Sequence, residues 1–95
     1  MPSIVDEAVT VTTAATLLCD GHARRRNLTF TNNGSVSVYL GSSGETSSAF
    51  FRALPAGETV EFTRGDGGDD PLPEAKWYGI TSSGSAAVAV GEILA

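Results

Sequence analysis

The sequence predicts an all-β protein, a small antiparallel β-sandwich or barrel of about seven short strands. Apolar and polar residues alternate with a period of two in several short stretches, which is typical of half-buried strands. Turn signals recur about every 8–12 residues, as they do in sandwiches and barrels. No stretch has a helical period, and the chain contains ten Ser, ten Thr and 11 Gly, a composition that favours strands and turns.

The first half of the chain predicts three strands, at residues 8–18, 25–32 and 36–40. In the second of them the alternation turns Leu28 and Phe30 inward and the intervening threonines outward. The Asn33-Gly34 dipeptide that follows predicts a tight hairpin into the third strand, because Asn and Gly tolerate the positive φ of such turns.

The second half predicts four further strands, at residues 49–54, 58–63, 77–81 and 86–90. Pro55-Ala56-Gly57 marks a sharp turn, and the Gly- and Asp-rich residues 65–73 predict the longest exposed loop. The apolar positions that share the inner faces of these strands form the expected core: Leu28, Phe30, Val38, Leu40, Val60, Phe62, Val88 and Val90. Burying each such side chain contributes roughly 1.5–3 kcal/mol.

Length and charge limit the organisation and the partners. Ninety-five residues suit one domain, which we place at residues 8–95, after an N-terminal arm at residues 1–7. The net charge of −5 argues against a nucleic-acid partner, which requires surplus Lys and Arg. No apolar run approaches the roughly 18 residues of a membrane span, so no membrane partner is predicted.

The side chains needed for catalysis or for metal binding are scarce, with one His, one Cys and one Lys. His22 lies in a turn region with no nucleophile in a recognisable arrangement beside it. Cys19 and His22 together fall short of the three or four ligands of a zinc site. Cys19 follows two leucines and is expected to pack as a small hydrophobic residue. We therefore predict no enzyme activity, no catalytic residue and no cofactor.

Acidic residues concentrate in one Gly-rich segment, residues 65–74. Four carboxylates lie within nine residues there, and carboxylate oxygens are the ligands that calcium prefers. Their spacing does not match an EF-hand loop, so a solvated or partner-facing loop is the alternative to a calcium site. The four residues are Asp66, Asp69, Asp70 and Glu74.

Half of the basic side chains of the protein lie in one run, Arg24-Arg25-Arg26. One interpretation is a solvated strand start; the other is a contact surface, because the planar guanidinium pairs well with carboxylates. The thin core and the strands that are apolar on both sides favour association with further copies of the chain. The candidate interface residues are Arg24, Arg25 and Arg26, the loop residues Asp66, Asp69 and Asp70, and the arm residues Ile4 and Val5.

Three stretches, taken in order, carry a resemblance to a known group of proteins. They are Arg26-Asn27-Leu28-Thr29-Phe30-Thr31-Asn32-Asn33-Gly34 with Val38-Tyr39-Leu40-Gly41, then Leu54-Pro55-Ala56-Gly57-Glu58, then Trp77-Tyr78-Gly79-Ile80 with Ala87-Val88-Ala89-Val90. This order resembles small all-β structural proteins of tailed bacteriophages, which include capsid decoration (cement) proteins and head-fibre proteins.

The resemblance implies a non-enzymatic virion structural protein that binds the assembled capsid surface and reinforces subunit contacts. The implied partners are the major capsid protein and further copies of the chain, with a trimer favoured. The implied location is the virion, after synthesis in the cytoplasm of a bacterial host. Two alternatives remain open: a carbohydrate- or receptor-binding module that uses Trp77, Tyr78 or Tyr39 as stacking platforms, and a minor head–tail or tail component.

Overall fold

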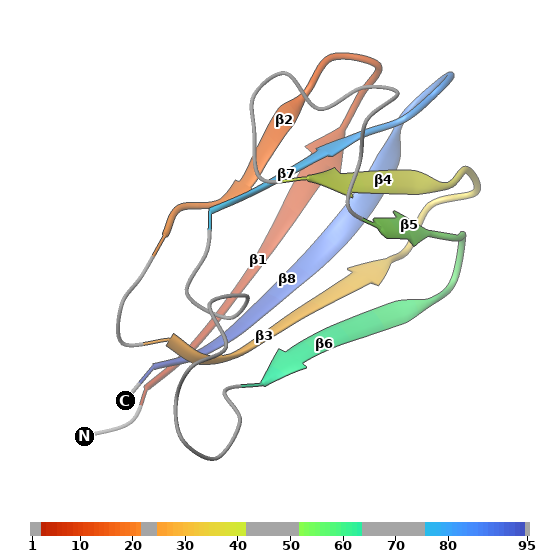
Figure 1. Ribbon diagram of the computed structural model, residues 1–95. Helices are drawn as coiled ribbons and strands as arrows, with labels where there is room; N and C mark the ends of the chain where they lie inside the picture. The colour runs from red at the N-terminus through yellow and green to blue at the C-terminus, as the bar shows by residue number, and fades with distance from the viewer. Residues whose placement is uncertain (1–2, 22–24, 42–51, 64–75, 95) are drawn as a thin grey trace.

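In the computed structural model, which describes residues 3–21, 25–41, 52–63 and 76–94, the described residues form two antiparallel four-stranded sheets (Figure 1). Sheet A contains, in spatial order, β1 (Ser3–Val11), β8 (Ala86–Leu94), β3 (Arg25–Asn32) and β6 (Thr59–Thr63). Sheet B contains β2 (Thr16–Cys19), β7 (Trp77–Ile80), β4 (Val38–Gly41) and β5 (Arg52–Leu54). The all-β sandwich is confirmed, with eight strands in the described residues rather than about seven.

The connections pass back and forth between the two sheets. Of the successive strands in the described residues, only β4 and β5 pair with each other, and every other strand is followed by one in the opposite sheet. The sheet orders β1-β8-β3-β6 and β2-β7-β4-β5 are those of a jelly roll, in which two Greek keys interleave. Most of the pairing is therefore between residues far apart in the sequence.

The prediction of one strand over residues 8–18 is wrong, because the chain leaves sheet A after Val11 and enters sheet B at Thr16. The turn between them is held by a threonine hydroxyl, since Thr12 Oγ1 accepts a hydrogen bond from the Ala14 N–H at 3.2 Å. The Thr12 carbonyl in turn accepts from the Thr81 N–H at 2.9 Å. Threonine turns carry a weaker sequence signal than Gly or Pro turns.

Residues 3–7, predicted to belong to an N-terminal arm, are the first half of β1. They pair with the last residues of β8, from Ser3 opposite Leu94 to Glu7 opposite Val90. Both strands run for nine residues, beyond the stretches where hydrophobic alternation predicts them. Backbone hydrogen bonds between the two strands, which need no apolar pattern, account for the extra length.

The predicted Asn33-Gly34 hairpin is also wrong, because β3 and β4 lie in different sheets. Among the described glycines, positive φ angles occur at Gly57 and Gly84 and not at Gly34. A Cβ atom on Gly34 would lie 2.5 Å from the Cβ of Ala86. Gly34 is therefore required for a close approach to β8 and not for a hairpin turn.

The turn predicted at Pro55-Ala56-Gly57 is present. The Glu58 N–H donates to the Pro55 carbonyl at 3.1 Å, and Gly57 has a φ of 80°. A glycine with positive φ at the third position is the requirement of a type II turn. This turn carries the chain from sheet B into β6 of sheet A.

Asn32 joins three segments at the end of β3. Its side chain is fully buried (0% exposed), and its Nδ2 donates to the carbonyls of Val36 at 2.8 Å and Leu54 at 2.9 Å. Its Oδ1 accepts from the Gly34 N–H at 2.9 Å. One amide thereby bonds to three backbone groups, as burial of polar groups requires.

The core lies between the two sheets, and all eight predicted core residues are buried. The alternation in β3, β6 and β8 therefore has the orientation predicted from the sequence. Further apolar side chains complete the core from β1, β2, β5, β7 and β8: Val11, Leu18, Cys19, Leu54, Trp77 and Ala86.

Candidate functional site

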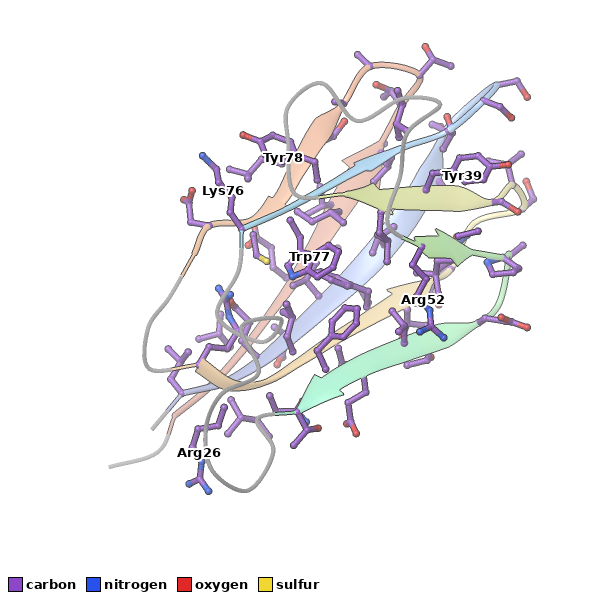
Figure 2. The ribbon with its side chains drawn as sticks, in the orientation of Figure 1. Arg26, Tyr39, Arg52, Lys76, Trp77 and Tyr78 are labelled. Carbon is purple, nitrogen blue, oxygen red and sulfur yellow. The ribbon has the colours of Figure 1, made fainter. Side chains whose placement is uncertain are left out.

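The space between the sheets is filled by an aromatic cluster. Trp77 of sheet B, 1% exposed, stacks on Phe62 of sheet A with ring centroids 4.8 Å apart. Phe30 packs edge-on against both rings, at 6.4 Å from Phe62 and 6.0 Å from Trp77. Such geometries stabilise aromatic pairs beyond the area they bury. Among the alternative stacking platforms, Trp77 is thus part of the core and points between the sheets (Figure 2).

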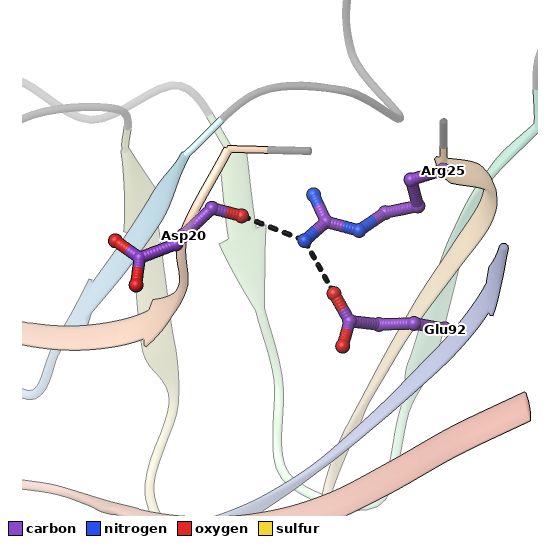
Figure 3. A network of polar contacts seen from close by, with 3 residues as sticks. All are labelled: Asp20, Arg25 and Glu92. Atoms are coloured by element: carbon purple, nitrogen blue, oxygen red, sulfur yellow. Dashed lines mark hydrogen bonds and ion pairs between the residues drawn. The ribbon is translucent and has the colours of Figure 1, made fainter. Parts of the chain in front are cut away.

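Arg25 of the predicted contact surface is turned into the protein. Its guanidinium is buried, 2% exposed, and its Nη2 donates to the Asp20 carbonyl at 2.6 Å and pairs with Glu92 Oε1 (Figure 3). A bulge between Arg25 and Asn27 interrupts the pairing with β8. Arg25 therefore ties the ends of β2, β3 and β8 together and is not available to an external partner.

Removing the carboxylate of this pair is expected to destabilise the fold. Glu92→Ala should lower the free energy of unfolding by about 2 kcal/mol, because it leaves a buried guanidinium without its counter-charge. The value lies below that of a fully buried pair because the Glu92 side chain is 16% exposed. The check is urea denaturation, with Glu7→Ala, an exposed acid on β1, as the matched control; equal midpoints for both variants would contradict it.

Cys19 packs as a small hydrophobic residue, as predicted. It is buried at the end of β2, opposite Trp77. Burial raises the pKa of its thiol from 9.0 to about 11, against the lowering effect of the nearby Arg25 charge. Because the thiolate is the reactive form, this cysteine is inert in the folded protein near neutral pH.

The raised pKa of Cys19 predicts slow thiol chemistry. At pH 8 the folded protein should react with a disulfide reagent about 100-fold more slowly than the urea-unfolded protein, since two pKa units change the thiolate fraction by that factor. Between pH 9 and 11 the unfolded chain releases this proton and the folded chain keeps it, so the free energy of unfolding falls with rising pH. Equal rates in both states at pH 8 would refute the prediction.

The outer face of sheet A carries mainly short side chains, apart from Ile93 near the end of β8, which is 39% exposed. The central strand β8 places Ala87, Ala89 and Gly91 on this face, with Ala89 opposite Thr31 and Gly91 opposite Thr29 of β3. With the flanking strands the face includes Thr10, Ala8 and Asp6 of β1 and Thr59, Glu61 and Thr63 of β6.

The polar side chains of this face are largely bonded to one another. The hydroxyls of Thr31 and Thr59 lie 2.9 Å apart across the β3–β6 pair. Asn27 Nδ2 donates to Thr63 Oγ1 at 3.0 Å, and Thr29 Oγ1 donates to Asn27 Oδ1 at 3.1 Å. A face whose polar groups already have partners can be covered by another surface at a small desolvation cost.

The outer face of sheet B is more apolar. Leu17, 39% exposed, lies opposite the half-buried Tyr78, and the half-buried Ile80 lies opposite Tyr39. The Lys76 ammonium is 5.6 Å from the centroid of the Tyr78 ring, within the range of a cation–π contact. Tyr78 and Tyr39 thus remain on the outside of the sandwich, on the face opposite to that of Trp77 (Figure 2).

The other predicted interface residues lie in different parts of the structure. Arg26 is exposed at the start of β3 (Figure 2), and Val5 is 38% exposed on β1. Ile4 lies in β1, opposite Ile93. The remaining predicted site residues lie outside the described residues, so their proposed contacts and the calcium question stay predictions: Arg24, Asp66, Asp69, Asp70, Glu74 and His22.

No set of three or more His, Cys, Asp or Glu side chains in the described ranges is placed to hold a metal ion. The same part of the chain contains no helix long and apolar enough to cross a membrane. The two outer sheet faces are the remaining candidate sites among the described residues. The sequence places Thr29 and Thr31 outward, but their partners on β6 and β8 depend on a strand order that no local pattern contains.

Comparisons with known proteins show similarity at the level of the fold. Neither a protein-family model nor a curated protein sequence matches the chain. The structure of hydroxypropylphosphonic acid epoxidase from S. wedmorenis in complex with fosfomycin is similar, with a TM-score of 0.58, 18% identity and coverage of 95% of this chain and 43% of the epoxidase. The chain therefore spans less than half the length of that enzyme.

Two other solved structures are similar over most of their own length. A protein named PirA has a TM-score of 0.55 and 15% identity, with 93% of this chain and 92% of PirA covered. A Bacillus endospore appendage, from a family of disulfide-linked pili, has a TM-score of 0.45 and 13% identity, with 100% and 88% covered. The likeness to the epoxidase and to PirA, at these identities, concerns the fold alone.

Proposed function

We propose that this protein is a non-enzymatic virion structural protein that binds the assembled capsid surface of a tailed bacteriophage and reinforces contacts between capsid subunits. The observation that carries the proposal is the division of the sandwich into a filled interior and two outer sheet faces. The space between the sheets is occupied by Trp77, Phe62 and Phe30. A partner would therefore contact the outer surface of the sandwich. The resemblance in the sequence to phage decoration and head-fibre proteins supplies the setting.

The mechanism of such a protein is mechanical. A rigid jelly roll seated across a junction between capsid subunits adds contact area, at roughly 25 cal/mol for each Å² of apolar surface removed from water. The outer face of sheet A suits this role, because Thr31 and Thr59, like Asn27 and Thr63, satisfy each other. The major capsid protein is the expected partner, and the virion surface is the expected location after synthesis in the bacterial cytoplasm.

A carbohydrate- or receptor-binding module is the second candidate, favoured by one observation. Tyr78 is half-buried on the outer face of sheet B, beside the exposed Leu17, and half-exposed aromatic rings can stack on apolar ligand surfaces. Trp77, the largest of the aromatic residues first considered for this role, belongs to the core. A minor head–tail or tail component differs from the leading proposal only in location.

Co-sedimentation separates these candidates. The purified protein is mixed with empty capsids, and separately with unassembled major capsid protein, from the phage whose genome encodes it. Pelleting with the shells and no association with free subunits supports decoration. Absence from the pellet at saturating concentration, together with glycan-array binding that Tyr78→Ala abolishes, would transfer the assignment to the carbohydrate-binding candidate.

A further inference from the structure

Each sheet ends in two edge strands, and one of these four differs from the rest. The edge strands β2, β5 and β6 contain four, three and five residues, and a register shift interrupts the pairing of β2. Short length and irregular pairing keep the free edge of a sheet from binding other strands. The edge strand β1 contains nine residues without Gly or Pro, and its register with β8 is unbroken (Figure 1). Among the described strands, β1 is therefore the edge best suited to pairing with a further strand.

The middle of β1 is accessible on both faces. Asp6, Glu7 and Ala8 are exposed, and Val5 is 38% exposed. Val5 and Glu7 lie on the inner face with the half-buried Val9, whereas Asp6 and Ala8 lie on the outer face. Within the described part of the chain, β8 is the one strand paired with β1. A partner strand at the free edge would therefore contact side chains on both faces.

Symmetry and charge restrict how two copies of β1 can pair. Opposite residues of an antiparallel pair point to the same face, so a symmetric pair is centred on a residue. A centre at Asp6 or Glu7 places two carboxylates directly opposite each other, which is unfavourable. A centre at Ala8 places Asp6 opposite Thr10 of the second copy and Glu7 opposite Val9 of the second copy. In this register no carboxylate lies directly opposite another.

The register centred on Ala8 also has the largest overlap among those that keep like charges apart. It pairs residues 5–11 of each strand, whereas a centre at Val5 or Val9 pairs only five residues of each. It also sets the exposed Val5 opposite Val11 of the second copy. Pairs of β-branched side chains across two strands are favourable, so the contact covers apolar surface that is exposed in the single chain.

We infer that two copies of this protein associate edge to edge through β1, as an antiparallel pair centred on Ala8. The pair joins the two copies of sheet A, each of four strands, into one continuous sheet. Both copies contribute the same surface, so the contact closes as a two-fold dimer and does not propagate. This contact goes beyond the proposed function and is separate from the trimer that the resemblance in the sequence implies.

The length of the paired strands predicts a weak contact. Residues 5–11 span about 24 Å, and a strip about 10 Å deep gives about 240 Å² for each copy. The two copies together bury about 500 Å², below the roughly 1,200 Å² of stable interfaces. About seven main-chain hydrogen bonds between the strands add to this area. We therefore expect a Kd between about 10 µM and 1 mM, so the dimer forms mainly where the protein is concentrated.

Position 10 tests the register, because Thr10 lies opposite Asp6 of the second copy on both sides of the axis. Thr10→Lys should tighten the dimer about fivefold, and Thr10→Glu should weaken it about fivefold, in sedimentation velocity at up to about 1 mM. Within one copy Thr10 lies opposite Ala87, which offers no charge. Ala56→Lys and Ala56→Glu, in the exposed turn before β6, change the net charge equally and should shift the Kd by less than about twofold.

A double variant makes the test specific to the pair of positions. Asp6→Lys combined with Thr10→Glu restores opposite charges across the axis, so it should dimerise at least as tightly as the wild type. Within one strand the two positions are about 14 Å apart, so they interact little in the single chain. Rescue of Thr10→Glu by Asp6→Lys therefore requires that position 6 of one copy faces position 10 of the other.

Cysteine cross-linking locates the axis. Ala8→Cys places two Cα atoms about 4.5–5.5 Å apart across the strand pair, within the range of a disulfide, so mild oxidation should yield a covalent dimer. Asp6→Cys should cross-link at least about tenfold more slowly, because its two copies lie about 14 Å apart along the strands. The wild type, whose one cysteine, Cys19, is buried, measures the background.

Circular dichroism verifies that each variant folds, and none of these measurements requires a capsid, so their failure is distinguishable from a failure of capsid binding. A wild type that stays monomeric at about 1 mM overturns the inference. So do equal responses to Thr10→Lys and Thr10→Glu, or faster cross-linking of Asp6→Cys than of Ala8→Cys. If the wild type stays monomeric and hydrogen exchange in β1 slows only when empty capsids are added, the edge binds the capsid protein and not a second copy.

Discussion

Replacing Asn32 by alanine is expected to lower the free energy of unfolding by about 4 kcal/mol, one of the two largest effects of a single substitution in this protein. The change leaves the carbonyls of Val36 and Leu54 and the N–H of Gly34 without their partner. Each buried polar group left unsatisfied costs about 1–3 kcal/mol. The free energy of unfolding of a small domain is only about 5–15 kcal/mol. Much of the stability of this protein therefore depends on the Asn32 amide.

Chemical denaturation followed by circular dichroism measures the effect of Asn32→Ala. Asn33→Ala is the matched control, because Asn33 is exposed and its hydrogen bond to Ala87 comes from the main chain. The control should change stability by less than about 0.5 kcal/mol. A loss below about 1 kcal/mol for Asn32→Ala would refute the role given to this side chain.

The second large effect is expected at Trp77. Trp77→Ala should cost about 4 kcal/mol, the range of large-to-small changes in a packed core, because the ring is 1% exposed and contacts Phe62 and Phe30 across the two sheets. Trp77→Phe keeps an aromatic ring and should cost about half as much.

Tyr78→Ala, one position along the same strand, is the control for Trp77→Ala. Tyr78 is half-buried on the outer face of sheet B, so its loss should cost about 1 kcal/mol. Thermal unfolding followed by circular dichroism gives the comparison. Equal losses at the two positions would mean that the ring of Trp77 does not hold the sheets together.

The local features of the fold were predictable, because they depend on residues close together in the sequence. The period of two in residues 25–32 gives both the limits of β3 and the burial of Leu28 and Phe30. The turn at Pro55–Glu58 follows from a glycine suited to positive φ. Alternation reports the two faces of a strand directly, whatever its neighbours are.

The order of the strands was not predictable in this way. In a jelly roll most neighbouring strands are distant in sequence, so the Asn33-Gly34 signal, which is local, indicated a pairing between β3 and β4 that does not occur. The glycine instead lies against Ala86, a contact between segments about fifty residues apart. A close approach of this kind requires glycine, and so does a tight turn, so the glycine alone does not show which of the two is present.

The candidate site was predictable in part for the same reason. Alternation places Arg25 on the opposite face from Arg26, and the structure buries Arg25 at a bulge where Glu92 meets it. Nothing near Arg25 in the sequence identifies that partner. The outer face of sheet A likewise needs β3 beside both β6 and β8, although alternation alone places Thr29 and Thr31 outward.

Electron cryo-microscopy of empty capsids, with and without saturating protein, shows whether the protein binds the assembled shell. We expect additional density on the outer capsid surface, of a size that fits copies of a 9.8 kDa jelly roll, seated over junctions between capsid subunits. Identical reconstructions with and without the protein would contradict it.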